Sequence, residues 1–360
     1  MCTDIDRIAE LAKEDSQRQF YSIAHLITAE KLYEAFRSLR KDASAGVDGV
    51  KYAEYETNAE ENVRQLHRRL VEGKYQAQPL RRVYIPKENG QQRPISIPAL
   101  EDKVVQKAVV DLLNAIYEQD FLECSYGFRP GRGQHQALEE VGRVICTRPT
   151  GWVLELDIRS YFDNIVRDTL IEMVGKRVSD GSVLRLIQKW IKVGVIENGK
   201  MFVSKTGTGQ GQPISPLLSN IYLHYLLDEW FEKVVKPRMK GEAYEIRFAD
   251  DAILCFQNKE DAEKVLSVLP KDANADGRTP AREMPQVVCV KEKQQDDADG
   301  EYDAGESYRE KAEGAGRPKA GGCLPGVHAQ RAPEEIDGQR EPECQQDDGE
   351  KQMTEEKDAA

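Results

Sequence analysis

Apolar side chains recur about one turn apart along much of the N-terminal half, the pattern of helices that each bury one face. One such helix is expected after Thr3 and a second after Thr28, with each threonine as the cap. A third follows Asn58, where Glu61 completes a predicted capping box, and it ends at Gly73. The same spacing predicts helices over residues 99–118, 167–178 and 182–193.

Shorter apolar runs predict strands, which in chain order are Val83–Ile85, Ile95–Ile97, 152–158, one near Met201–Val203 and two within Glu245–Gln257. The first two flank a turn at Asn89–Gly90, and the last two meet at an Ala-Asp-Asp turn. Ile246 and Phe248 alternate with polar residues, which predicts a strand with one buried face. Helices are expected after the glycine-rich segment that precedes Pro213, and over about 259–269. The chain is therefore a mixture of helices and strands.

The net charge of −12 is unevenly distributed. Residues 271–360 hold 23 of the 63 acidic residues and only 13 of the 51 basic ones. This segment also lacks Phe and Trp, so it has little with which to build a core and is expected to be disordered. Because residues 1–270 are close to neutral, the overall acidity does not argue against a nucleic-acid partner for that part of the chain.

The seven cysteines are scattered, without CxxC spacing and without a cluster of histidines beside them. This arrangement argues against a zinc site or a disulfide framework and fits a reducing cytoplasm. The chain starts with a charged, amphipathic segment rather than a signal peptide, and no window holds 18 consecutive apolar residues. We therefore expect no membrane span and a cytoplasmic location.

Three acidic residues stand where strands end. Asp157 is at the C-terminal end of the 152–158 strand, and Asp250 and Asp251 are at the tip of the last hairpin. An ordinary surface turn explains the adjacent pair equally well when it is taken alone, because turns favour Asp. Three converging carboxylates repel one another, and hard divalent cations such as Mg²⁺ relieve that repulsion. The three acids together therefore indicate two-metal nucleotidyl transfer.

Basic residues gather in two segments of the chain. The hairpin of residues 81–98 carries Arg81, Arg82, Lys87 and Arg93, which suit a triphosphate clamp, although an ordinary charged hairpin is the simpler alternative. A second segment, SYGFRPGRGQHQAL, interleaves aromatic and basic residues around glycines, as surfaces that meet a nucleic-acid backbone do.

Six runs occur in order within residues 28–270: SAGVDG, PKENGQQRPISIP, YGFRPGRGQHQAL, LDIRSYFDNI, GTGQGQPISPLLSNIYL and RFADDAILCF. Together they resemble the reverse transcriptase family, most closely the enzymes encoded by bacterial group II introns. The resemblance implies an α+β fold with the fingers and palm of a right-hand polymerase, including an antiparallel palm sheet backed by helices. It also implies an RNA-directed DNA polymerase that uses dNTPs, a primer–template and two Mg²⁺ ions, with group II intron RNA as a partner.

The resemblance implies roles residue by residue. Those implied to bind the two Mg²⁺ ions are Asp157, Asp250, Asp251 and the backbone carbonyl of Ile158. Those implied to bind the nucleotide are Lys87 and Arg93 at the triphosphate, Phe162 against a ribose 2′-hydroxyl, and Gln210 at the nucleotide and template. The run GTGQGQ departs from the family's usual GTPQGG at Gly209 and Gln212, which is expected to loosen that loop, and Phe248 replaces the commoner Tyr.

The resemblance divides the chain into an N-terminal helical extension (1–75), a partial fingers and palm domain (76–270) and the acidic tail (271–360). The thumb expected after the palm is missing, and the abrupt change in composition suggests a frameshift near residue 270, with a natural acidic tail as the alternative. A chain truncated in this way is expected to have reduced activity. Two other functions stay open, which are an intron-RNA-binding maturase without polymerase activity and another kind of bacterial reverse transcriptase.

Overall fold

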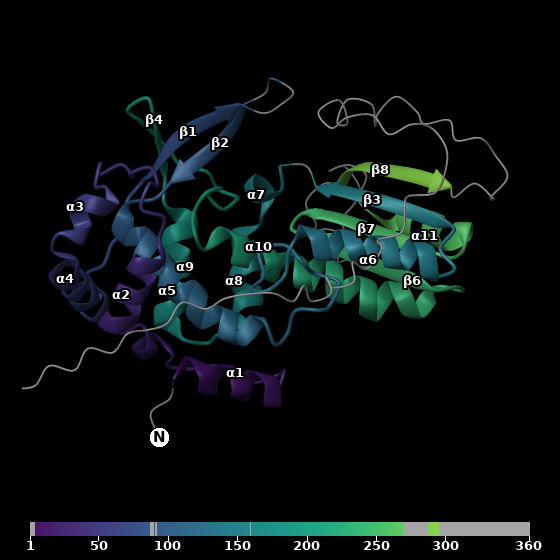
Figure 1. Cartoon of the computed structure of the whole chain (residues 1–360), viewed down its shortest axis with the longest axis horizontal. Coiled ribbons are helices and arrows are strands. Elements are labelled where there is room, and N and C mark those ends of the chain that lie inside the picture. Colours follow the sequence, from purple (N-terminus) through teal and green to yellow (C-terminus); the bar gives the residue numbers. More distant parts are fainter. Residues whose placement is uncertain (1–3, 87–89, 91, 159, 270–286, 295–360) are drawn as a thin grey trace, which may run out of the picture. The chain divides into compact units, whose positions relative to one another are not determined.

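The structure is a computed structural model that describes residues 4–86, 90, 92–158 and 160–269, and the backbone of 287–294 (Figure 1). These residues belong to one compact unit, Met1–Ala298. The predictions for the rest of the tail, including the missing thumb, lie outside the described residues. No helix in the described part is long and apolar enough to cross a lipid bilayer.

Helices α1 (Ile5–Glu14), α2 (Ala29–Ser38), α3 (Tyr52–Glu56) and α4 (Ala59–Val71) form the N-terminal part, and α1 and α2 pack on α5 (Leu100–Tyr117). Thr28 caps α2 as predicted, since its hydroxyl accepts from the Lys31 N–H at 3.2 Å. Two other predicted caps are wrong: Asp4 caps α1, and Asn58 makes no side-chain capping bond. Glu61 instead accepts a hydrogen bond from Gln65, one turn along the same helix.

The first sheet has the order β2-β1-β4-β5. Strands β1 (Leu80–Pro86) and β2 (Gln92–Ile97) form the predicted hairpin, and β1 also pairs in parallel with β4 (Val195–Glu197). Strand β5 (Lys200–Phe202) completes the sheet as the antiparallel partner of β4. The sequence pattern indicated β5 but not the three-residue β4, which is too short to show an alternation.

The second sheet is antiparallel throughout, with the order β6-β7-β3-β8, and confirms the predicted palm sheet. Its strands are β3 (Trp152–Ile158), β6 (Ala243–Phe248), β7 (Asp251–Phe256) and β8 (Val287–Gln294). The composition after residue 270 predicted no strand, and β8 corrects this prediction. The run Val287–Val290 is rich in β-branched residues that favour an extended backbone, and the charged composition around it obscured this signal.

Helices cover both faces of the second sheet (Figure 1). Helix α6 (Gln134–Thr147) packs Ala137 and Val144 on the face that carries Ile253 and Cys255 of β7. Helix α11 (Lys259–Val268) packs against β3 and β7, and the other alternate residues of β3 and β7 join the main core with it. This alternation fixes which side chains of each strand share a face.

The remaining helices link the two sheets. They are α7 (Tyr161–Asn164), α8 (Arg167–Gly175), α9 (Gly181–Lys192) and α10 (Ser215–Leu223), and α10 packs on α8 and α5. One continuous hydrophobic core runs from the N-terminal helices through α5 and α10 to the second sheet. The division at residue 75 stays a prediction, because the core crosses it.

Candidate active site

The register of the second sheet brings two of the predicted acids opposite each other. The β3–β7 ladder ends at the pair Leu156 and Ala252, and the same register continued by one residue sets Asp157 opposite Asp251. Residues directly opposite in antiparallel strands have Cβ atoms about 5 Å apart and point to the same face. Both side chains are exposed, which suits groups that bind a ligand.

Asp250 stands in the turn between β6 and β7, half-buried beside this pair. Burial raises the pKa of the Asp250 carboxyl, and the charge of Asp157 raises it further. A backbone hydrogen bond, Arg93 and Arg247 act against this rise. The structure therefore brings the three predicted acids together at one end of the sheet, with Arg93 of β2 within electrostatic reach.

The three carboxylates do not form a tight chelating group. In the described part of the chain, the one group of three His, Cys, Asp or Glu ligand atoms within 4.8 Å of one another is Cys124, Asp228 and Glu245. Mutual repulsion favours a wider spacing of Asp157, Asp250 and Asp251.

The predicted nucleotide-binding residues lie on segments that are tied to one another by backbone hydrogen bonds. The Thr208 N–H donates to the Phe162 carbonyl at 2.8 Å, and the Ser96 N–H of β2 donates to the Gln210 carbonyl at 2.7 Å. Phe162 is half-buried against the core, Gln210 is half-buried, and Arg93 is exposed. Lys87 lies outside the described residues. The loop that carries Gln210 thus bridges α7 and the β1–β2 hairpin.

The two departures in this loop fit together structurally. Gln212 is buried, and its side-chain oxygen accepts from Nε2 of the buried Gln106 at 2.9 Å. A Cβ added at Gly209 would lie 2.9 Å from Nε2 of Gln212 and 2.6 Å from Cδ1 of Leu80. The absence of a side chain at residue 209 therefore makes room for the buried amide. The hydrogen bond of Gln212 ties this end of the loop to α5, whereas a loosened loop stays a prediction.

Two arginines of the predicted basic segments make contacts within the protein instead. Arg129 is 6 % exposed, pairs with Glu118 at 3.0 Å and donates to the Leu122 and Ser125 carbonyls at 2.8 Å. Arg81 donates through Nε and Nη2 to the Ala45 carbonyl. Interleaving of charge and glycine in the sequence does not distinguish an arginine that binds backbone carbonyls from one that faces a ligand.

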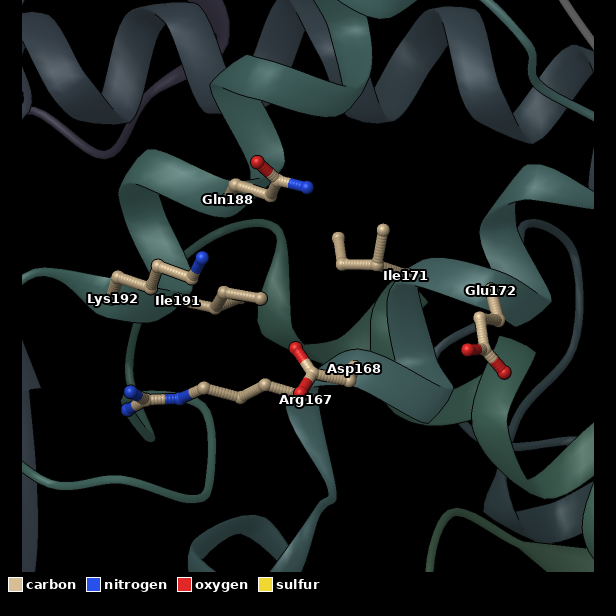
Figure 2. Close-up of a pocket in the computed structure, with 7 residues that line it drawn as sticks. All are labelled: Arg167, Asp168, Ile171, Glu172, Gln188, Ile191 and Lys192. Atoms are coloured by element: carbon tan, nitrogen blue, oxygen red, sulfur yellow. The ribbon is translucent and has the colours of Figure 1, made fainter.

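A separate hollow of about 270 Å³ lies between α8 and α9 (Figure 2). Its lining contains residues of both charges, namely Arg167, Lys192, Asp168 and Glu172. None of the predicted site residues lines it. Arg167 donates to the Gly207 and Ser204 carbonyls, so its guanidinium ties the glycine-rich segment to α8.

Sequence reasoning missed Arg247, which is fully buried below the turn that carries Asp250. The alternation of Ile246 and Phe248 predicted that Arg247 faces solvent. The structure corrects this, because Glu245, Ile246 and Arg247 are all buried in succession. An arginine between two core residues of a strand, with acids elsewhere able to pair with it, was the available signal.

Comparisons with known proteins show which family the chain belongs to. A model of the family described as "Reverse transcriptase (RNA-dependent DNA polymerase)" matches residues 85–279. Protein YkfC of Escherichia coli (strain K12) is 38% identical over 249 residues, which is 67% of this chain and 64% of YkfC. The group II intron-encoded protein LtrA of Lactococcus lactis subsp. cremoris is 36% identical over 224 residues, which is 62% of this chain and 37% of LtrA.

Two further likenesses are weaker. An uncharacterised 91 kDa protein in the cob intron of Schizosaccharomyces pombe is 33% identical over 211 residues, covering 58% of this chain and 26% of that protein. A chain of the solved "Partial Cas6-RT-Cas1--Cas2 complex" aligns with a TM-score of 0.40 and 22% identity over 68% of this chain and 39% of that one, too weak a likeness to add to the argument. This chain thus spans less than two thirds of the curated relatives it matches. On the family match over residues 85–279 and these relatives, the chain belongs to the reverse transcriptases and maturases of group II introns.

Proposed function

We propose that this chain is an RNA-directed DNA polymerase that adds deoxynucleotides to a primer 3′-hydroxyl on an RNA template. The observation that supports the proposal is the β3–β7 register, which continued by one residue sets Asp157 opposite Asp251, with Asp250 in the adjoining turn. Phosphoryl transfer needs a protein mainly to position its reactants and to neutralise charge. Three acids at the exposed end of a rigid sheet suit that task.

The donor set fits two Mg²⁺ ions, which we propose as cofactors held by Asp157, Asp250, Asp251 and the Ile158 carbonyl. The fit rests on hard oxygen ligands and on the raised pKa of Asp250, whose burial and whose neighbour Asp157 are only partly offset by nearby donors and arginines. Bound magnesium would supply charge neutralisation at the reacting phosphate.

The chain's own residues have distinct parts in this proposal. Arg93, exposed on β2, binds the triphosphate, together with Lys87. Phe162 packs against the hydrophobic core, which holds its ring in place. The ring sterically excludes a ribose 2′-hydroxyl. Gln210 contacts the incoming nucleotide and the template from a loop that is fixed to β2.

Single-nucleotide incorporation on a primed RNA template, in Mg²⁺, tests the proposal. The wild-type chain should add the complementary dNTP, and the Asp250→Asn/Asp251→Asn variant should lose this activity while keeping its thermal unfolding transition. Incorporation that survives the double substitution, or none by the folded wild-type chain, contradicts the proposal.

Assistance to intron splicing is the second candidate. A relative titled "Nuclear intron maturase 3, mitochondrial" of Arabidopsis thaliana, 26% identical over 149 residues, favours it. Binding of group II intron RNA does not need the acids, so the double Asn variant should bind that RNA as the wild-type chain does. A splicing role alone predicts RNA binding without any incorporation by either form.

A further inference from the structure

Arg247 has a partner for every N–H group that its side chain carries. Its Nε and Nη2 donate to the two carboxylate oxygens of Asp228, both at 2.6 Å. Its Nη1 donates to the Ala249 carbonyl at 2.8 Å and to Oδ1 of Asn220 at 3.2 Å, and Nη2 also donates to Oγ of Ser125 at 2.8 Å. A guanidinium has five donors in a fixed plane, so this set of acceptors fixes its orientation completely.

A π-helical turn allows Asn220 and Asp228, which follow each other along one helical segment, to contact Arg247 together. Asn220 lies in α10 and Asp228 ends the π-helical turn His224–Asp228 that follows it. In a regular α-helix a residue eight positions on is rotated about 80° beyond two full turns, so the two side chains would diverge. A π-helical turn holds about one residue more and brings them back to one face. Both then contact Arg247.

The Ala249 carbonyl that Arg247 holds belongs to the turn that bears the acids. Ala249 has a φ of +58°, a left-handed backbone that costs a non-glycine residue about 1 kcal/mol or more. Gly127 packs against this turn so closely that a Cβ there would lie 2.2 Å from the Ala249 nitrogen. The Gly127 carbonyl in turn accepts from Nδ2 of Asn220 at 2.7 Å. The turn is therefore clamped between Arg247 and the Gly127 loop.

The acidic neighbours of Arg247 belong to its own buried surroundings. Asp228 offsets the charge of Arg247, and burial together with the charge of Asp228 raises the pKa of Glu245 well above its ordinary value. Its neighbour Cys124 likewise has a pKa raised by burial. The group of Cys124, Asp228 and Glu245 is thus part of the arginine's own surroundings, and the guanidinium would repel a cation placed there.

We propose that Arg247, held by Asp228, is a positioning residue that sets the orientation of Asp250 and Asp251 through the Ala249 carbonyl. The inference rests on the proposed polymerase function. It assigns Arg247 no contact with substrate, so its effect is expected on turnover and on the use of metal ions rather than on the KM for dNTP.

Arg177 provides a matched control, because it is another buried arginine paired with an aspartate, Asp120, at 2.9 Å. It donates to the Ala12 and Asp15 carbonyls, on the side of the molecule that bears α1. Arg247→Lys and Arg177→Lys should lower the unfolding temperature comparably. Only Arg247→Lys should reduce incorporation per folded molecule, by about 10- to 100-fold, as small misplacements of reacting groups do. It should also raise the Mg²⁺ concentration needed for half-maximal rate.

The variant Arg247→Met/Asp228→Met separates positioning from stability. Replacing a buried ion pair by apolar residues of similar size often leaves stability unchanged or raises it. The double variant should therefore unfold close to the wild-type temperature while incorporation stays reduced, because the Ala249 carbonyl has lost its donor. Recovery of activity along with stability would show that the pair is merely structural and would overturn the inference.

Mn²⁺ binding, measured by electron paramagnetic resonance on the same proteins, makes the outcome independent of turnover. If the folded wild-type chain incorporates nothing, the proposed function fails, whereas the inference still predicts tighter Mn²⁺ binding by the wild-type chain than by Arg247→Lys. If the wild-type chain and Arg247→Lys bind Mn²⁺ with equal affinity, the inference is wrong even if polymerase activity is found.

Discussion

Gln212→Ala tests whether the glycine-rich loop is held by a buried amide. The substitution removes the hydrogen bond from Nε2 of Gln106 at 2.9 Å and the longer one that Gln212 donates to the Trp190 carbonyl at 3.4 Å. Gln106 is fully buried and has no other partner for this amide group in the hydrogen bonds of the described residues. The substitution therefore leaves an unpaired amide in the core.

The expected loss follows from these contacts. Leaving a buried amide unsatisfied costs about 1–3 kcal/mol, and the space vacated by the longer side chain adds to it by about 24 cal/mol per Å³ of residual cavity. We expect Gln212→Ala to lower the free energy of unfolding by about 2–4 kcal/mol. Gln65→Ala, at an exposed position of α4, should change it by less than about 0.5 kcal/mol.

The same loop gives a sharper test as a double-mutant cycle. Gly209→Ala places a Cβ 2.9 Å from Nε2 of Gln212 and 2.6 Å from Cδ1 of Leu80, so overpacking should cost about 1–3 kcal/mol. Adding Gln212→Gly removes the first of these contacts. Urea denaturation of the two single variants and the double variant should show a coupling above about 0.5 kcal/mol. Additive effects would refute the view that residues 209 and 212 form one unit.

Three further predictions rest on single side chains. The pKa of Asp250 is raised in the fold, so the stabilisation from its protonation is complete below the unfolded-state pKa of about 3.9 and is lost as the pH rises through the raised value. Asp250→Asn should therefore unfold at a higher temperature than the wild-type chain at pH 7 in EDTA. A lower or equal unfolding temperature contradicts this prediction. Asp180 caps α9 by accepting from the Ser182 N–H at 2.7 Å and also holds the Ala24 N–H at 2.8 Å; Asp180→Ala should lower the free energy of unfolding in urea by about 1–2 kcal/mol, and an unchanged midpoint would exclude the capping role. Phe162→Val should raise incorporation of ribonucleotides relative to deoxynucleotides, measured by single-nucleotide extension, and an unchanged ratio would remove Phe162 from sugar selection.

The sequence predicted the elements whose periodicity is regular. Both hairpins, the β3 strand and helix α5 are where the pattern placed them. Prediction failed where a polar residue is buried by partners far along the chain. Arg247 meets Asp228 and Ser125, which are 19 and 122 positions away, and no local pattern encodes such a meeting.

Each of the two motifs that carry the proposed site is held by a buried polar pair of which one member lies on a helix. The ion pair of Arg247 and Asp228 holds the turn of Asp250. The hydrogen bond between Gln106 and Gln212 holds the loop of Gln210. Buried polar pairs contribute little net stability over apolar residues of the same size, but their directional bonds specify one arrangement of the backbone. A sequence run such as RFADD or GTGQGQ therefore mixes residues suited to meet a ligand with residues that hold the backbone still, and burial in the fold is what separates the two kinds.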